Sequence, residues 1–91
     1  MLDIRIENVL NDENPVDFNK EVKLINGILD EFNFKIDEKY SEGDDTYYIF
    51  SINDEESITI EIGYYCVTVK ATCKSIVIPI SVYNFIEKEI N

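Results

Sequence analysis

The spacing of apolar residues changes between Phe32 and Phe34, and this change constrains the fold more than any other feature. Between residues 18 and 32, apolar side chains recur every three or four positions, as they do on one face of a helix: Phe18, Val22, Ile25, Leu29 and Phe32. From Phe34 onward, they instead alternate every second residue, which is typical of strands with one buried face. We therefore expect one amphipathic helix over about 15–32, followed by a series of strands.

The start and the middle of this helix carry local signals. Asn14 can cap the helix, and Pro15 suits its first position, where a missing N–H costs nothing. Gly27 is unfavourable inside a helix by roughly 1 kcal/mol relative to Ala. We expect either a close approach of the backbone to the sheet at Asn26-Gly27 or a kink there.

Four stretches after the helix read as strands separated by short turns, and short turns join antiparallel neighbours. Gly43 can adopt positive φ in the first turn, and Asn53 begins the second. In the third strand, Ile58, Ile60 and Ile62 are expected to point inward. The expected strands are 34–40, 46–52, 57–62 and 65–72.

The two ends of the chain are more ambiguous. Apolar residues at 2, 4 and 6 alternate with charged ones and favour a strand, although Leu2, Ile6 and Val9 also fit a helix. Residues 75–80 suggest a last strand, in which Pro79 would lie at an edge or at the strand's end. Ser81 can cap a final helix over about 82–90.

These elements predict a single α+β domain over residues 1–91. A sheet with one apolar face needs cover, and the amphipathic helix supplies it. We expect a two-layer sandwich with an antiparallel meander of four to six strands and helices at about 15–32 and 82–90. Tyr47 and Tyr48 should point to opposite sides of their strand. The second sheet face, either wet or an interface, should hold Tyr47, Ile49, Ser51, Thr59, Glu61, Thr68 and Lys70.

Charge narrows the possible partners. The chain has 19 acidic and 8 basic side chains, a net charge of −11, and 17 of the acids lie in residues 1–61. Binding to bare nucleic acid or to anionic membranes needs an excess of Lys and Arg, so both are disfavoured. A basic protein surface is the expected partner. With no long apolar run and no signal-like start, a cytoplasmic location is expected.

The residue inventory argues against an enzyme. Histidine is absent, which excludes Ser–His and Cys–His nucleophilic pairs, and the three glycines are isolated. Cys66 and Cys73 cannot complete a zinc site without further ligands, and the acids lack EF-hand spacing. We expect no catalytic residues, no metal and no cofactor, and two reduced thiols.

Acids and tyrosines define the candidate partner-binding site. Residues 37–61 hold nine acids against Lys39 alone, and the chain has six tyrosines. Such carboxylates can stand in for phosphates opposite the Lys and Arg of a nucleic-acid-binding protein, and tyrosine is favoured at interfaces. The alternative is that the acids are ordinary solvated loops and the tyrosines simply favour strands. The candidate residues are Asp37, Glu38, Glu42, Asp44, Asp45, Tyr47, Asp54, Glu55, Glu56 and Glu61.

In size, charge and helix–meander–helix order, the chain resembles small acidic anti-CRISPR proteins and related nucleic-acid-mimic inhibitors of phages. The resemblance implies a phage or mobile-element protein that blocks the nucleic-acid site of a defence effector in the bacterial cytosol. The helices at 15–32 and 82–90 around a meander also resemble the type III secretion chaperone-like fold, which implies a dimeric protein-binding module. The alternative function is therefore a dimeric chaperone-like or immunity-type protein-binding module. A third possibility is a protein that sequesters a nucleotide signal, for which Arg5, Lys70 and Lys74 would supply the cations.

Overall fold

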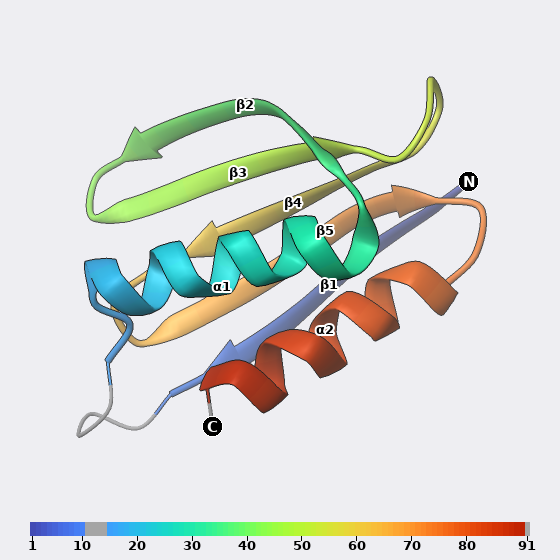
Figure 1. Cartoon of the computed structure of the whole chain (residues 1–91). Coiled ribbons are helices and arrows are strands. Elements are labelled where there is room, and N and C mark those ends of the chain that lie inside the picture. Colours follow the sequence, from blue (N-terminus) through green and yellow to red (C-terminus); the bar gives the residue numbers. More distant parts are fainter. Residues whose placement is uncertain (11–14, 91) are drawn as a thin grey trace.

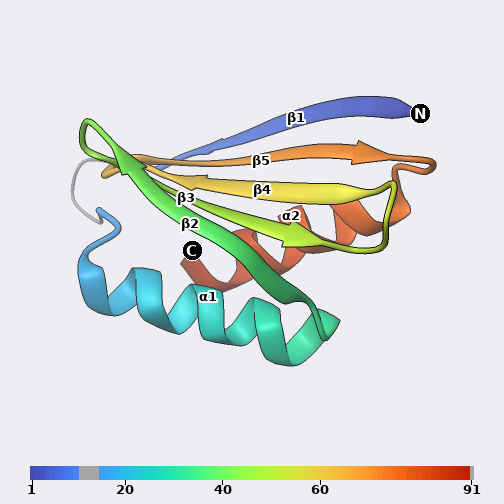
Figure 2. The same cartoon turned by 90° about the horizontal axis from the view of Figure 1, so that it is seen from above.

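The computed structural model of the chain describes residues 1–10 and 15–90. One five-stranded antiparallel sheet has the order β1-β5-β4-β3-β2, and both helices lie on the same side of it (Figures 1 and 2). The expected two-layer α+β sandwich is therefore confirmed. Along the chain the elements are β1 (Leu2–Val9), α1 (Phe18–Phe32), β2 (Lys35–Glu42), β3 (Asp45–Ser51), β4 (Ser57–Ile62), β5 (Cys66–Cys73) and α2 (Val77–Ile90).

The core forms between the sheet and the two helices. Ile58, Ile60 and Ile62 of β4 are all buried, as their alternation predicts, and Tyr48 and Phe50 lie beside them on β3. Tyr47, the neighbour of Tyr48, points to the other side of the sheet, because successive side chains of a strand alternate. The helices contribute Leu24, Ile25, Ile28, Val82, Ile86 and Ile90 to the core.

The N-terminal segment is a strand, which settles the alternative left open by its sequence. β1 pairs with β5 over all eight of its residues, from Leu2 opposite Cys73 to Val9 opposite Cys66. The chain thus returns to its own start, and β1 and β2 become the two edges of the sheet.

Helix α1 begins later than the sequence suggests. Asp17 caps it, accepting a hydrogen bond from the backbone N–H of Lys20 at 2.8 Å, and Pro15 lies before the helix. Asn14, the expected cap, lies outside the described residues. The buried face also differs from the expected stripe, since Phe18 is 70% and Val22 39% exposed. Helix α1 packs against α2 as well as against the sheet. Its buried face therefore includes Leu24 and Ile28, which lie beside the expected stripe.

Gly27 marks a close approach, but to the second helix rather than to the sheet. A Cβ atom added at Gly27 would lie 2.8 Å from Cζ of Phe85 on α2. The helix runs without interruption to Phe32 and ends at Asn33, which has left-handed φ of 56°. Of the two expectations for Gly27, a close approach is thus correct and a kink is wrong, but the approach is to α2 instead of the sheet.

Residues 75–80 do not form the expected last strand, and Ser81 is not a cap. Helix α2 starts at Val77, whose N–H donates to Ser75 Oγ at 3.2 Å, and Ser81 lies inside it, donating to the Val77 carbonyl. The β-branched run before Pro79 favours a strand by local propensity. Pro79, however, has no backbone N–H, so it fits the first turn of a helix, where N–H groups have no partner within the helix. Its ring is buried there.

No helix formed by residues 1–10 and 15–90 is long and apolar enough to span a membrane.

Candidate partner-binding face

The sheet face opposite the helices is uncovered, and we call it the open face (Figure 2). The register aligns its side chains in rows across the strands. One row runs from Glu7 through Thr68, Glu61 and Tyr47 to Tyr40. All seven residues expected on this second face lie there. The open face comprises Asp3, Arg5, Glu7, Val9, Lys35, Glu38, Tyr40, Glu42, Asp45, Tyr47, Ile49, Ser51, Ser57, Thr59, Glu61, Cys66, Thr68, Lys70 and Thr72.

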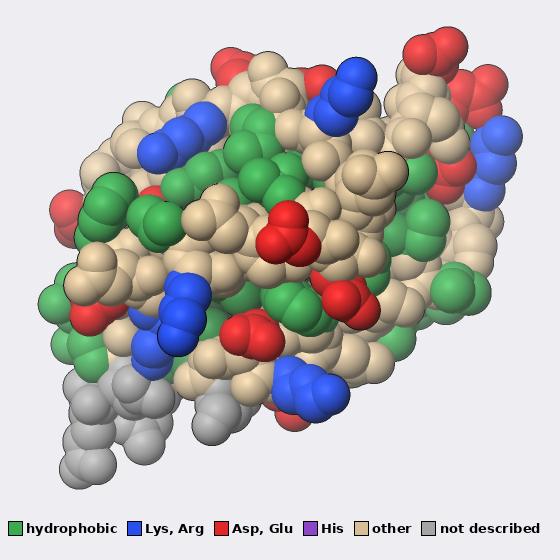
Figure 3. Space-filling view, viewed as in Figure 1, with side chains coloured by type: hydrophobic (Ala, Val, Ile, Leu, Met, Phe, Trp, Pro, Cys, Tyr) green, Lys and Arg blue, Asp and Glu red, His purple; other side chains and the backbone are tan. Residues whose placement is uncertain are grey.

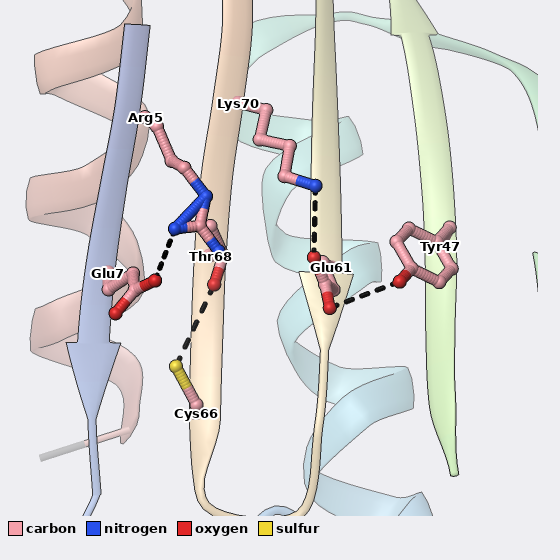
Figure 4. A network of polar contacts seen from close by, with 7 residues as sticks. All are labelled: Arg5, Glu7, Tyr47, Glu61, Cys66, Thr68 and Lys70. Atoms are coloured by element: carbon pink, nitrogen blue, oxygen red, sulfur yellow. Dashed lines mark hydrogen bonds and ion pairs between the residues drawn. The ribbon is translucent and has the colours of Figure 1, made fainter. Parts of the chain in front are cut away.

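A hydrogen-bond network is centred on Glu61 (Figure 4). The Tyr47 hydroxyl donates to Glu61 Oε2 at 3.1 Å, and Lys70 Nζ lies 3.2 Å from Glu61 Oε1. The Asp45 carboxyl also shares a hydrogen bond with Glu61, which is the main reason why the pKa of Asp45 is raised; burial adds to it. Burial tends to raise the pKa of Glu61, but hydrogen bonds with Asp45, Lys70 and Tyr47 outweigh it and the pKa is lowered. Glu61 is therefore a fixed anion on the open face.

Two tyrosines form a flat aromatic surface beside this anion. The rings of Tyr40 and Tyr47 stack with centroids 4.7 Å apart and an interplanar angle of 7°. Lys70 Nζ lies 5.9 Å from the Tyr47 ring centroid. Burial and the hydrogen bond to Glu61 raise the pKa of Tyr47. The Tyr47 hydroxyl therefore stays protonated and can donate its hydrogen bond to Glu61.

The β1 side of the open face is more mixed in charge. Arg5 pairs with Glu7, and Asp3 accepts a hydrogen bond from the Thr72 hydroxyl at 3.1 Å. A hollow of about 280 Å³ lies between Arg5 and Lys70. A wider one of about 490 Å³ is lined by acids and by Tyr64 and Tyr65, which belong to the turn before β5. Both basic side chains face a carboxylate, so neither hollow is a simple cationic pocket.

The structure divides the sequence-predicted site residues into separate groups. Glu38, Glu42, Asp45, Tyr47 and Glu61 lie together on the open face. Asp44 lies in the β2–β3 turn next to them, and Asp37, in the β-bulge of β2, accepts a hydrogen bond from the Ser51 hydroxyl. A third group, which we call the turn acids, lies between β3 and β4: Asp54, Glu55 and Glu56.

The turn acids and the β2–β3 turn are at opposite ends of the sheet. The seven residues of β3 separate them, a length of about 20 Å at roughly 3.3 Å per residue. Since neighbouring strands run antiparallel, successive turns alternate between the two ends. The acids that are dense in the sequence therefore do not form one continuous cluster.

Two of the turn acids already have partners within the chain. Glu56 Oε2 accepts from the backbone N–H of Lys74 at 2.9 Å, and Glu56 Oε1 accepts from the Asn53 side chain at 2.8 Å. These bonds, the first above all, lower the pKa of Glu56. Glu55 pairs with Lys74 Nζ at 3.1 Å. Glu56 and Glu55 thus connect the β3–β4 turn to the segment between β5 and α2.

Three acidic or aromatic residues of the open face were not among the predicted site residues: Asp3, Glu7 and Tyr40. A signal for Tyr40 was present, because a hairpin that turns at Gly43-Asp44 places position 40 opposite position 47. Gly43 has the positive φ that such a turn requires, 62°. For Asp3 and Glu7, the alternation with apolar residues indicated only the outer side of a strand, because their neighbours depend on the distant pairing of β1 with β5.

The remaining chemistry-bearing groups lie apart from each other. Cys66 and Cys73 are free thiols at opposite ends of β5, and burial raises the pKa of Cys73. Within residues 1–10 and 15–90, no three acidic or thiol side chains are grouped as metal ligands.

The chain was compared with protein families, curated proteins and solved structures. No protein family, curated protein or solved structure matches the chain.

Proposed function

We propose that the protein is a non-enzymatic inhibitor that occupies the basic nucleic-acid-binding site of another protein. The open face is its contact surface, the target is a host defence effector, and the protein itself acts as an anti-CRISPR-like inhibitor. On this proposal, the protein is encoded by a phage or another mobile element and acts in the bacterial cytosol.

The observation that carries the proposal is the row in which the stacked Tyr40 and Tyr47 adjoin the fixed anion Glu61. Arg and Lys side chains that grip phosphate oxygens also bind carboxylates through charge-assisted hydrogen bonds. Aromatic rings provide stacking surfaces of the kind that nucleic-acid sites employ. A rigid sheet holds these groups about 4.8 Å apart from strand to strand, so little ordering is needed on binding.

The charge of the open face supports the same partner. Its six acids outnumber its three basic residues, Arg5, Lys35 and Lys70, and the whole chain has a net charge of −11. A strongly negative molecule is drawn toward a positively charged groove and associates with it faster at low salt. The six acids are Asp3, Glu7, Glu38, Glu42, Asp45 and Glu61.

The two other functions considered from the sequence have less support in these contacts. A chaperone-like module needs an apolar groove for its client, whereas the open face is mostly polar. A nucleotide-binding site needs unneutralised cations, whereas Arg5, Lys70 and Lys74 each face a carboxylate.

The proposal is tested by measuring whether the protein prevents purified RNA-guided nucleases from binding their target DNA. We expect one or more of them to bind the protein, to lose DNA binding, and to release the protein as salt is raised, because screening shortens charge interactions to about 10 Å at 0.1 M. A full panel of nucleases that neither bind nor respond would overturn the proposal.

Two double variants then locate the contact. Glu38→Gln with Glu42→Gln removes two charges from the open face, and Asp54→Asn with Glu55→Gln removes two from the turn acids. We expect the first pair to weaken inhibition about tenfold or more and the second to change it much less. Equal losses, or a larger loss for the second pair, would show that the open face is not the contact surface.

A further inference from the structure

The two edges of the sheet differ in how open they are to another strand. β2 has a bulge between Ile36 and Glu38 and carries Lys35 and Lys39, features that discourage strand addition. β1 has neither a bulge nor a lysine, and its register with β5 is unbroken over eight residues. The free side of β1 is therefore a regular edge to which a further strand can pair.

The register identifies the backbone groups on that free edge. The N–H of Leu10 donates to the Tyr65 carbonyl at 2.8 Å and continues the pairing in which Val9 lies opposite Cys66. Backbone groups of alternate residues point to alternate sides of a strand, so even-numbered residues face β5. The N–H and C=O groups of Asp3, Arg5 and Glu7 consequently point outward, away from β5.

We propose that this edge pairs with the same edge of a second copy of the chain. In the resulting dimer, the two β1 strands run antiparallel about a two-fold axis and join both sheets into one. This inference does not depend on the proposed function, because it rests on the free backbone edge of β1 and on the register of the dimer, whatever the open face binds.

Symmetry and charge together select the register of this pairing. A two-fold axis perpendicular to the sheet places one residue of β1 opposite itself, since residues in direct opposition share a face. An axis at Arg5 would oppose two arginines, and would also oppose Asp3 to Glu7. Like charges in direct opposition are destabilising.

An axis at Ile4 gives a complementary arrangement instead. Asp3 of each copy then lies opposite Arg5 of the other, and these are the residues whose backbone groups face outward. On the other sheet face, Leu2 lies opposite Ile6 and Ile4 opposite itself, so apolar side chains meet. An axis at Ile6 would pair Arg5 with Glu7 but would set Ile4 against Asn8. We therefore assign the axis to Ile4.

Exposed apolar side chains lie at the end of β1 that this axis adjoins. Met1 is 63%, Leu2 48%, Ile76 51% and Val77 66% exposed. The start of β1, the end of β5 and the start of α2 share this end of the molecule in both ribbon views, and hydrophobic side chains are visible there in Figure 3. An apolar surface of this kind is typical of an interaction site.

The oligomeric state and two charge reversals test the dimer. Sedimentation velocity from micromolar to millimolar protein should show a reversible dimer of the 10.6 kDa chain. Asp3→Arg or Arg5→Asp alone should weaken the dimer about tenfold or more, because each variant opposes like charges twice. An equimolar mixture of the two variants should restore a heterodimer, since both pairs are then complementary. Lys35→Asp, a charge reversal on the β2 edge, is the matched control and should leave the dimer unchanged.

Amide hydrogen exchange provides a second readout that does not depend on the variants. The amides of Asp3, Arg5 and Glu7 should become protected as the protein concentration rises, while those of Ile4 and Ile6 are protected throughout. Circular dichroism should show both variants folded. A wild-type chain that stays monomeric at millimolar concentration overturns the inference. So does a mixture that fails to restore the heterodimer, or a dimer in which the three outward amides still exchange freely.

Discussion

Glu56 is a glutamate at the surface whose main contacts are within its own chain. It accepts hydrogen bonds from the backbone of Lys74 and from Asn53, and Asn53 in turn accepts from the backbone N–H groups of Glu55 and Glu56. In the sequence, Glu56 is indistinguishable from its acidic neighbours. Its partners show that it stabilises a turn, whereas Glu42 and Glu38 lie on the open face.

These contacts predict how stability depends on pH. The folded-state pKa of Glu56 is below its ordinary value of 4.5, so the ionised side chain stabilises the fold above that pH. The contribution is lost as the pH falls through the lowered pKa. Glu56→Gln should therefore reduce the free energy of unfolding at neutral pH, and the difference from wild type should vanish in acid. Urea unfolding across this pH range measures it, and a difference that grew toward low pH would contradict the prediction.

At the level of the elements, the contact between the two helices depends on Gly27. The Phe85 ring fills the space above Gly27 and also packs edge-on against Phe32, with centroids 5.9 Å apart. Gly27 lowers the helix propensity of α1, but the Phe85 ring of α2 leaves no room for a side chain at this position.

A larger residue at Gly27 has two opposing effects on stability: it improves helix propensity and it crowds the Phe85 ring. Gly27→Ala gains about 1 kcal/mol of helix propensity but forces the Phe85 ring to move, and such overpacking typically costs about 1–3 kcal/mol. We expect a net destabilisation of about 1 kcal/mol, measured by urea unfolding. In a Phe85→Leu background the crowding is relieved, and the same substitution should become neutral or stabilising. Destabilisation of equal size in both backgrounds would show that Phe85 is not the cause.

At the level of the whole molecule, negative charge opposes folding and promotes the proposed association. Ion pairs such as Lys70–Glu61 and Lys74–Glu55 join opposite charges, while the chain has a net charge of −11. Self-repulsion of this size destabilises the compact state and is screened by salt.

Salt should therefore act in opposite directions on the fold and on the complex. Raising sodium chloride from low to moderate ionic strength should raise the thermal unfolding midpoint of the free protein. The same change should weaken its complex with a basic partner. Thermal scans and binding measurements on one salt series test both effects. A midpoint that falls with salt would mean that attractive pairs outweigh the repulsion.

Local pattern was sufficient to predict most of the elements. The isoleucines at 58, 60 and 62 marked both the bounds and the inward face of β4, and Gly43 marked a turn that requires positive φ. Such signals act within a few residues, through side-chain alternation and backbone sterics. Residues 75–80 were misassigned because a β-branched run and a proline are compatible with two local structures. Burial of Pro79 and Val82 against the sheet favours the helix.

The arrangement of the candidate site needed contacts between distant parts of the chain. The acids of residues 37–61 are adjacent in sequence, but antiparallel pairing carries Glu42 and Glu56 to opposite ends of the sheet. The pairing of β1 with β5 brings Asp3 and Glu7 onto the open face and leaves β1 with a free edge. Composition and periodicity describe each segment by itself, whereas strand order and register depend on which segments share the buried core. That is why the type of each element can be read locally, while the shared surface of acids and tyrosines appears only in the folded chain.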